Sequence, residues 1–298
     1  MVTFYRRLPM VDYVKPENLD EALSLISQTP EGKYRVYAGG TDLIPKLKGR
    51  VIKAPEFLID LKGIPGLDYI DFDDQSGLRI GALATVRSVE TSTIITEKYP
   101  ILSQAAKSIA SIQVRNRGTI AGNICNAVPS ADSAPALLCL DAKLLCSGSS
   151  GDRVIDIKNF FSGPNKTVLK PDELLKEIKI PAGPEMSQGV YIKLSTRSSM
   201  DLAVVGVGVL AAVEDGVFKG IRIGLGAVAP TPIRAFEAEA MLEGSKIGKD
   251  IIAKAAKTAS EEALPIDDHR ASALYRKMMV EVLVKRGLHQ CLSENIQP

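Results

Sequence analysis

The sequence predicts an α+β protein with two domains, an α/β unit followed by a smaller α+β unit. Its 298 residues exceed the usual length of one domain. Helix and strand patterns alternate in the first third, whereas three strand-like runs precede three helical patterns after residue 189. Pro and Gly crowd into residues 181–189, where apolar periodicity stops. We therefore expect domains at 1–181 and 182–298.

The first third contains one amphipathic helix and several short strands. "PENLDEALSLIS" places Leu19, Ala22, Leu23 and Ile26 on one helical face, at spacings of three and four. "RVYA" then predicts a short strand, and "TDLIPKLK" predicts the start of a short helix. "EFLIDL" and "LRIGA" predict two more strands, so this part is of the α/β type.

The middle of the chain is less regular. A helix is predicted over residues 100–111, where Ile101, Ala105 and Ile109 are the apolar positions. The next stretch, "VRNRGTIAGNICNAVPSADSAPALLCLDA", is predicted to be rich in loops. "KLLC" and "RVIDI" flank the turn-like "SGSSGD" and predict a hairpin, and "LKEIKIP" alternates as a strand does.

The second domain is expected to be strands followed by helices. The strands are predicted at "VYIKLS", "LAVVGVGVLAAV" and "FKGIRIGLGAV". The "GVG" at residues 206–208 lacks the third glycine of a dinucleotide fingerprint, so close packing within a strand is expected there. Helices are predicted at "IRAFEAEAML", "DIIAKAAKTASEEAL" and "RASALYRKMMVEVLVKRGL". In the last, Leu274, Met278 and Val282 form an apolar face.

Composition argues against several functional classes. The net charge is +2 and the charges are mixed along the chain, so nucleic acid is not an expected partner. The N-terminus lacks an apolar signal core, and the longest apolar run has 12 residues, so a cytoplasmic protein without a membrane span is expected. The four cysteines form no C-x-x-C pair, so reduced, mostly buried thiols are expected, with no metal or cluster site. No catalytic role is expected for the two histidines.

The stretch "YAGGTDLIPK" at residues 37–46 raises the first question of function. A glycine-rich turn between a strand and a helix exposes N–H groups that can bind an anion. Gly39 and Gly40 would let the backbone approach a phosphate, and Thr41 could donate its hydroxyl. Asp42 is expected to cap the helix that begins near Leu43. A plain turn with a helix cap would have the same sequence pattern.

A second stretch, "RGTIAGNICNAVPSAD" at residues 117–132, again combines glycines with small polar residues. Gly118, Thr119 and Gly122 could form a second backbone loop on the same anion. Asn123 could bind a phosphate or a ribose, and Asp132 could accept a hydrogen bond from a ribose hydroxyl. An irregular surface loop is the alternative.

These two stretches resemble the FAD-binding medium subunit of the xanthine dehydrogenase family of molybdenum hydroxylases. That family carries an A-G-G-T-like loop and a T-I-G-G-N loop that share the FAD diphosphate. "YIKLSTRSSMDLAVVGVG", "GLGAVAPTPIRAFEAE" and "DDHRASALYRKMMVEVL" also resemble its C-terminal half. The resemblance implies a two-part, PCMH-like α/β FAD-binding domain and a small C-terminal domain like that of the carbon monoxide dehydrogenase flavoprotein. "NIC" and "SADSAP" favour the xanthine dehydrogenase type over the carbon monoxide type.

The resemblance also implies a set of FAD-binding residues at the matching positions. The first diphosphate loop would consist of Val36, Tyr37, Ala38, Gly39, Gly40, Thr41, Asp42 and Leu43. The second would consist of Thr119, Ile120, Ala121, Gly122 and Asn123. The family usually has Gly where this chain has Ala121. The change would cost about 1 kcal/mol if φ is positive there and would be harmless otherwise.

Four further positions complete the implied site. Ala110 would approach the cofactor through its backbone, and Asp132 would bind the adenosine-side sugar or the diphosphate region. Leu175 would pack beside the isoalloxazine ring. Lys193 would reach the pyrimidine edge, where a cation stabilises reduced flavin, although a solvated strand lysine is the alternative.

The resemblance implies an electron-transfer subunit that does not itself oxidise the substrate. A large molybdopterin-binding subunit would hydroxylate it, and a small subunit with two [2Fe–2S] clusters would relay electrons. FAD on this chain would pass them to NAD⁺ or another acceptor, within a dimer of heterotrimers. Two alternatives stay open: a stand-alone FAD-dependent reductase of the same fold, and an assembly module without flavin, for which Ala121 is the one hint.

Overall fold

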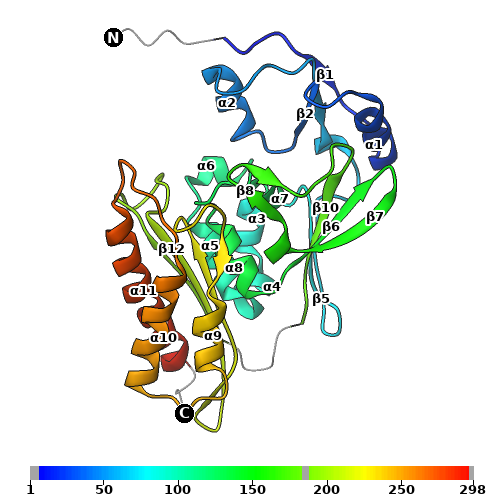
Figure 1. Ribbon diagram of the computed structural model, residues 1–298. Helices are drawn as coiled ribbons and strands as arrows, with labels where there is room; N and C mark the ends of the chain where they lie inside the picture. Colours follow the sequence, from blue (N-terminus) through cyan, green and yellow to red (C-terminus); the bar gives the residue numbers. More distant parts are fainter. Residues whose placement is uncertain (1–6, 183–187, 295–298) are drawn as a thin grey trace.

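A small parallel sheet forms the N-terminal part of the computed structural model, which describes residues 7–182 and 188–294 (Figure 1). Its strand order is β1-β3-β2. The elements are β1 (Asp12–Val14), α1 (Leu19–Gln28), β2 (Tyr34–Tyr37), α2 (Leu43–Gly49) and β3 (Phe57–Asp60). The predicted amphipathic helix is confirmed: Asn18 caps α1 by accepting from the Glu21 N–H at 2.9 Å, and Ala22 and Ile26 are buried.

A five-stranded antiparallel sheet in the order β4-β5-β10-β6-β7 forms the middle of the molecule. Its strands are β4 (Ile70–Asp73), β5 (Gly77–Gly81), β6 (Lys143–Gly148), β7 (Gly151–Asp156) and β10 (Leu174–Ile180). A small hairpin, β8 (Phe161–Gly163) with β9 (Lys166–Thr167), lies between β7 and β10 in the chain. The predicted hairpin at "SGSSGD" is therefore confirmed, whereas β1, β4, β8 and β9 were not predicted, because they are too short to show periodicity.

Short helices pack beside this sheet, and they correct the expectation of a loop-rich stretch after residue 111. The helices are α3 (Val86–Thr91), α4 (Thr93–Lys98), α5 (Pro100–Lys107), α6 (Ile112–Arg115), α7 (Ile120–Cys125) and α8 (Ser133–Cys139). The loop prediction was wrong for two physical reasons. Helices α6 and α7 are too short for periodicity to be visible, and every residue of α8 is buried, so that α8 has no polar face.

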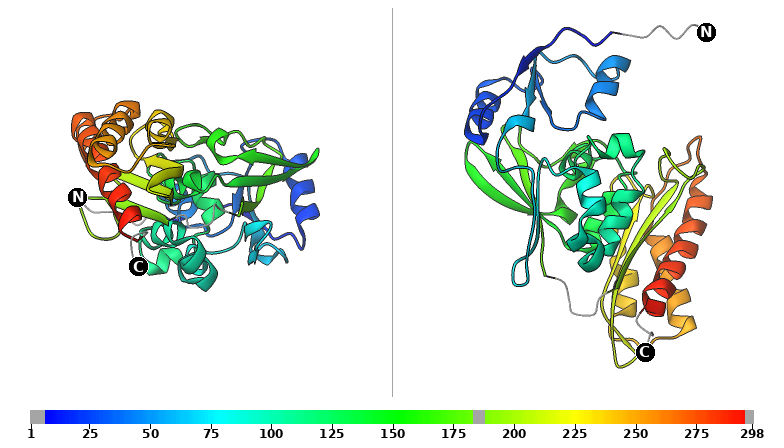
Figure 2. Two further views of the ribbon diagram at one scale, coloured as in Figure 1. Left: turned by 90° about the horizontal axis from the view of Figure 1, so that it is seen from below. Right: turned by 180° about the vertical axis from the view of Figure 1, so that it is seen from behind.

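The C-terminal part is a four-stranded antiparallel sheet covered by helices, as predicted. The order is β11-β12-β13-β14. Its elements are β11 (Gln188–Leu194), β12 (Val205–Glu214), β13 (Val217–Gly226), β14 (Ile233–Arg234), α9 (Phe236–Leu242), α10 (Lys249–Glu262) and α11 (Ala273–Glu294). Helices α10 and α11 lie on one side of this sheet and the helices of the N-terminal half on the other (Figure 2). The sheet thus joins the two halves.

Glycines on β12 and β13 let helix α8 lie directly on the sheet. A Cβ built on Gly224 would lie 2.3 Å from the carbonyl oxygen of Pro135, and one on Gly208 would lie 3.1 Å from the same atom. Real Cβ atoms do not approach backbone so closely, so these positions require glycine. The expectation of close packing at "GVG" is confirmed.

The apolar face predicted for the last helix is wrong. Leu274 and Met278 are 71% and 55% exposed. The stripe that faces the sheet instead includes Val280, Val284 and Leu288. The helix turns this stripe inward because the small Gly287 lets Val209 of β12 approach: a Cβ on Gly287 would lie 2.7 Å from Val209 Cγ2.

The segment between the two predicted domains is only partly described. Strand β10 ends at Ile180 and β11 begins at Gln188, and residues 183–187 of the predicted linker lie outside the described residues. The boundary at 181/182 thus stays a prediction.

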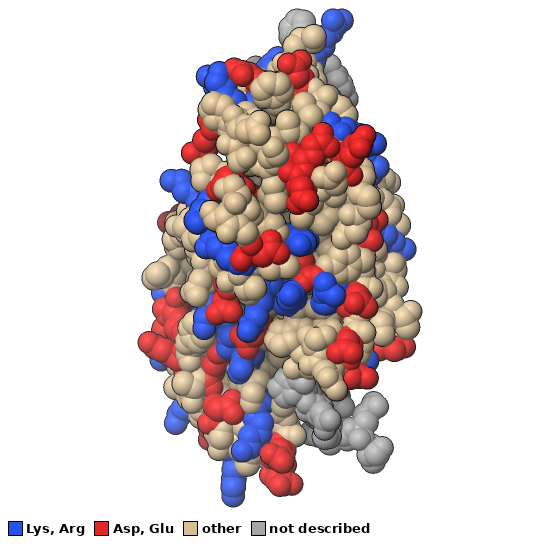
Figure 3. Space-filling model, turned by 90° about the vertical axis from the view of Figure 1, so that its right-hand side faces the viewer, with Lys and Arg blue, Asp and Glu red and all other residues tan. Residues whose placement is uncertain are grey.

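Acidic and basic side chains are interspersed over the face shown in Figure 3. Among the residues that the structure describes, no helix is both long and apolar enough to cross a bilayer. Three of the four cysteines, Cys139, Cys146 and Cys291, are buried, as expected.

Candidate functional site

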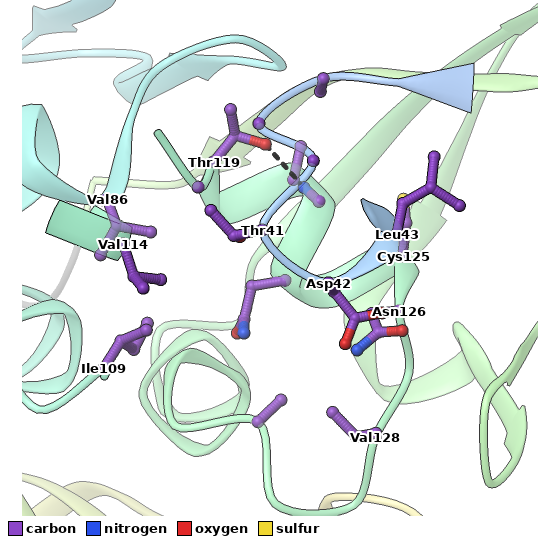
Figure 4. Close-up of a pocket in the computed structure, with 18 of the residues that line it drawn as sticks. Thr41, Asp42, Leu43, Val86, Ile109, Val114, Thr119, Cys125, Asn126 and Val128 are labelled. Atoms are coloured by element: carbon purple, nitrogen blue, oxygen red, sulfur yellow. Dashed lines mark hydrogen bonds between the residues drawn. The ribbon is translucent and has the colours of Figure 1, made fainter. Parts of the chain in front are cut away.

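A cleft of about 730 Å³ opens where the two glycine-containing loops meet (Figure 4). This volume suits a cofactor-sized ligand. All but three of the predicted site residues line it: Val36, Ala38, Gly39, Gly40, Thr41, Asp42, Leu43, Ala110, Thr119, Ala121, Gly122, Asn123, Asp132 and Leu175. Tyr37, Ile120 and Lys193 lie behind its wall. The structure thus brings together segments that are far apart in the sequence.

The two loops touch each other backbone to backbone at Gly39. A Cβ built on Gly39 would lie 2.0 Å from the carbonyl oxygen of Arg117 and 2.7 Å from Cα of Gly118. Only glycine fits this contact. Thr41 completes it from the first loop, because its Oγ1 would lie 3.1 Å from a Cβ on Gly118. The loops therefore form one cradle, whose width is set by a contact between backbones.

The first loop is supported from beneath by Tyr37. Gly40 has φ +71°, a conformation that favours glycine, and a Cβ there would lie 2.1 Å from Tyr37 Cε2. The Lys62 ammonium lies 3.3 Å from the centre of the Tyr37 ring and donates a hydrogen bond to the Ala38 carbonyl at 3.3 Å. Lys62 is in turn paired with the buried Asp60 at 2.7 Å. Tyr37 is therefore positioned to support the loop and does not line the cleft.

The second loop is the beginning of helix α7. Thr119 caps it: its Oγ1 accepts from the Gly122 N–H at 2.9 Å (Figure 4). Ile120 is fully buried and points into the core, so it can contribute only backbone to the site. Ala121 lies within the helix and is not among the residues with positive φ, so its substitution for the family's glycine is harmless to the backbone.

Asp42 does not cap helix α2, and this corrects the sequence expectation. It occupies the N-cap position but makes no capping hydrogen bond with its side chain. Its carboxylate instead pairs with Lys46, one helical turn later, at 2.7 Å. Lys46 also donates to Asn126 Oδ1 at 2.7 Å, which joins α2 to the end of α7. Both Lys46 and Asn126 line the cleft but were not predicted. Lys46 follows Asp42, and Asn126 follows Asn123, by about one helical turn, and this spacing could have indicated that they share a helix face with those residues.

Asp132 is the buried acidic group of the cleft. Its side chain is held by two donors from β11: the Tyr191 hydroxyl on Oδ1 and the Lys193 ammonium on Oδ2, each at 2.8 Å. Lys193 also donates to the Ser108 carbonyl at 3.1 Å. Burial raises the pKa of the Asp132 carboxyl above its usual value, and Lys193 and Tyr191 oppose that rise. Lys193 is thus a partner of Asp132 behind the cleft wall, and Tyr191 was not predicted at all.

Apolar side chains form another wall of the cleft. Ile109, Val114, Val86 and Leu175 line it together with Ala110. Ala110 has φ +44°, which is unusual for a residue with a Cβ, and its contact with the cofactor through the backbone stays a prediction.

The salt bridge between Glu90 and Arg115 holds this wall. Arg115 Nε donates to Glu90 Oε2 at 2.7 Å, and Arg115 Nη1 donates to the Ile109 carbonyl at 2.9 Å. The apolar side chains are therefore held in place, and this side of the cleft can exclude water from the apolar part of a ligand.

The C-terminal half contributes the rim of the cleft. Met200, Asp201 and Leu202 line it, and Met200 is 67% exposed with φ +54°. Asp201 accepts a hydrogen bond from the Arg197 N–H at 3.0 Å. Asp201 therefore lies at the cleft edge and makes a hydrogen bond within its own loop.

Two family models cover most of the chain. The one described as the FAD binding domain in molybdopterin dehydrogenase matches residues 9–183, and the one described as the CO dehydrogenase flavoprotein C-terminal domain matches residues 190–291. Among curated proteins, the glyceraldehyde dehydrogenase medium chain of Sulfolobus acidocaldarius is 33% identical over 95% of this chain and 98% of its own length. The carbon monoxide dehydrogenase medium chain of Hydrogenophaga pseudoflava is 34% identical over 94% and 96%.

The xanthine dehydrogenase FAD-binding subunit of Escherichia coli O157:H7 is 30% identical over 94% of this chain and 96% of its own length. These identities do not separate the xanthine dehydrogenase type from the carbon monoxide type. A solved structure of carbon monoxide dehydrogenase from Hydrogenophaga pseudoflava, lacking the Mo-pyranopterin moiety, superposes with a TM-score of 0.92 at 34% identity. It covers 96% of this chain and 99% of that one. The predicted two-part fold is thereby confirmed.

Proposed function

This chain belongs to the FAD-binding medium subunits of the molybdenum hydroxylase family, and we propose that it relays electrons from partner iron–sulfur clusters to NAD⁺ or another acceptor. FAD is its cofactor and oxidoreduction its class of reaction. The observation that carries the proposal is the cradle at Gly39, where two loops meet with backbone alone and open onto one cleft.

The residues present fit the cofactor. In the proposed arrangement the diphosphate lies against the backbone of Gly39, Gly40 and Thr41 on one side and of Gly122 and Asn123 on the other. The first loop would supply N–H groups to the anion. The second loop would supply shape instead, because the Gly122 N–H already donates to Thr119 Oγ1 and the Asn123 N–H to the Thr119 carbonyl. Ala38 and Val36 then form the floor of the first loop, and Tyr37 supports it from outside the cleft.

The flavin ring is assigned to the apolar wall formed by Ala110, Val114 and Leu175. A wall of this kind excludes water and so strengthens the electrostatic interactions inside the cleft. Asp132 supplies a carboxylate that can accept hydrogen bonds from cofactor hydroxyls, and Lys193 supplies a positive charge directly behind it. The contact of Lys193 with the pyrimidine edge stays a prediction, and its pairing with Asp132 gives it a second route of influence on the cofactor.

Bound FAD would supply redox chemistry in which electrons are taken up singly and released as a pair. The protein side contributes binding, orientation and electrostatics. Asp132, the buried carboxylate that lines the cleft, is engaged with Tyr191 and Lys193, so we assign it to holding the cofactor and not to acid–base catalysis.

The proposed partners are a large molybdopterin-binding subunit and a small [2Fe–2S] subunit, assembled as a dimer of heterotrimers. Support comes from the relatives, several of which are named as medium chains or subunits, and from the match over nearly their full length. The substrate would be oxidised on the large subunit. A stand-alone FAD-dependent reductase is the alternative.

The test is gentle purification from the native host, followed by quantification of flavin, molybdenum and iron against this chain. The proposal predicts one FAD per chain, with molybdenum and iron in two co-purifying subunits. FAD without metals or partners would support the stand-alone reductase instead. Metals and partners without FAD would identify the chain as an assembly module and refute the relay.

A further inference from the structure

We propose that Tyr191 is a positioning residue for the cofactor: its hydroxyl orients the Asp132 carboxylate toward the cleft. The inference rests on the proposed FAD-binding role of the cleft and adds a residue from the C-terminal half. Tyr191 does not line the cleft, so it would act through Asp132 alone.

The geometry around Asp132 leaves little freedom for its side chain. Each carboxylate oxygen takes one donor, Tyr191 on Oδ1 and Lys193 on Oδ2, both at 2.8 Å. Asp132 is only 7% exposed and Tyr191 is also 7% exposed. Each oxygen keeps a further lone pair, which can accept from a cofactor hydroxyl.

Strand β11 is held so that both donors reach the same carboxylate. Tyr191 and Lys193 are two residues apart and therefore project from the same face of the strand. The Tyr191 N–H donates to Gln104 Oε1 of helix α5 at 2.9 Å, which fixes the strand against the N-terminal half. This hydrogen bond thus fixes the position of Tyr191 relative to helix α5.

Gly206 on the neighbouring strand makes room for that ring. It pairs with Lys193 in the β11–β12 ladder, and a Cβ on it would lie 2.7 Å from the Tyr191 hydroxyl oxygen. Any larger residue there would push the hydroxyl away from Asp132. The first glycine of the "GVG" motif therefore leaves the space that the Tyr191–Asp132 hydrogen bond needs.

Loss of the hydroxyl would leave Oδ1 without its donor in a buried site. The groups that act on the pKa of Asp132 are Lys193, through charge and a hydrogen bond, and Tyr191, through a hydrogen bond; both lower it against the effect of burial. The neighbouring helix α5 contributes the Ser108 carbonyl, which binds Lys193. Without Tyr191, Asp132 would take up a proton at a higher pH and lose its ability to accept from two sides.

The test compares Tyr191→Phe with Tyr69→Phe in the full chain freed of flavin. Tyr69 is a matched control because its hydroxyl also donates to a carboxylate, that of Glu177, and neither residue lines the cleft. FAD affinity is measured by flavin fluorescence between pH 6 and 8.5, and the thermal midpoint of each flavin-free variant reports folding. We expect about tenfold weaker binding in Tyr191→Phe at pH 8. Tyr69→Phe should bind as the wild type does.

A double-mutant cycle with Asp132→Asn separates positioning from general support of the fold. If Tyr191 acts through Asp132, Tyr191→Phe has no further effect on FAD affinity in the Asp132→Asn background. Equal losses in both backgrounds, unchanged affinity, or failure of Tyr191→Phe to fold would each overturn the inference. A wild-type chain that binds no FAD would instead refute the proposed function.

Discussion

Gly39→Ala is the substitution that the cradle should tolerate least. The added methyl group would lie 2.0 Å from the Arg117 carbonyl oxygen and 2.7 Å from both Arg117 C and Gly118 Cα. All three atoms belong to the backbone of the second loop, so no side chain can rotate away. Relief therefore requires the two loops to separate.

The size of that separation follows from the contact. An ordinary contact begins at about 3.4 Å, so the loops must move apart by about 1.4 Å at this point. Overpacking of this kind costs about 1–3 kcal/mol of stability. If the movement breaks one or two N–H bonds to a phosphate, the loss is about 3 kcal/mol of binding free energy, or roughly 150-fold in FAD affinity.

The assay is an FAD titration of flavin-free protein, with urea unfolding in parallel. Gly248→Ala is the control, since a Cβ at Gly248 has nothing within 4 Å and Gly248 does not line the cleft. The control should bind FAD as the wild type does. Wild-type affinity in a folded Gly39→Ala variant would refute the argument that the two loops jointly hold the diphosphate.

Three further predictions concern stability, each measured by urea unfolding. G224A places a methyl group 2.3 Å from a backbone oxygen of helix α8 and should lower the free energy of unfolding by about 1–3 kcal/mol; no change would mean that α8 can shift freely. D268N should cost about 3 kcal/mol at pH 7, because it weakens the pairing of the buried Arg276. Hydrogen bonds from Arg270, then the charge of Arg276, hold the pKa of Asp268 below its usual value, so its contribution is present above about pH 4 and lost as the pH falls further. The difference between D268N and wild type should therefore narrow below pH 4, and a constant difference would contradict this reasoning. Ala110→Gly relieves a positive φ and should change stability by less than about 1 kcal/mol, whereas a larger loss would assign a packing role to the methyl group.

The sequence predicted the regular parts of the fold because their patterns are long enough to show a period. Strands β11, β12 and β13 and helices α1 and α10 were found in this way, whereas the short β14 lies where a helix was predicted. Helix α8 was missed because it is buried on every side, and its composition of small apolar residues has no period. The outward face of α11 was misassigned because Leu274 and Met278 are apolar yet exposed. A sequence alone does not distinguish an exposed apolar residue from a buried one.

The site was predictable where glycine was required and not where contacts join distant strands. Gly39, Gly40 and Gly122 were predicted because glycine is the one residue without a Cβ, so a position where the backbone must be accessible can be identified from the sequence. Tyr191 could not be found, because its role depends on a hydrogen bond to Asp132 across 59 positions. Lys193 was predicted as a cation near the cofactor, and its ion pair with the buried Asp132 is a matter of packing that spacing does not reveal.

The central claim is that the two loops hold the diphosphate of FAD. It is tested most directly by titrating the flavin-free full chain with FAD and with riboflavin, which carries the same ring system without phosphates. We expect one FAD per chain and riboflavin binding at least 100-fold weaker, because riboflavin lacks the diphosphate and the adenosine, and the phosphate contacts contribute about 3 kcal/mol or more. Equal affinity for the two flavins would mean that the cradle at Gly39 holds no phosphate.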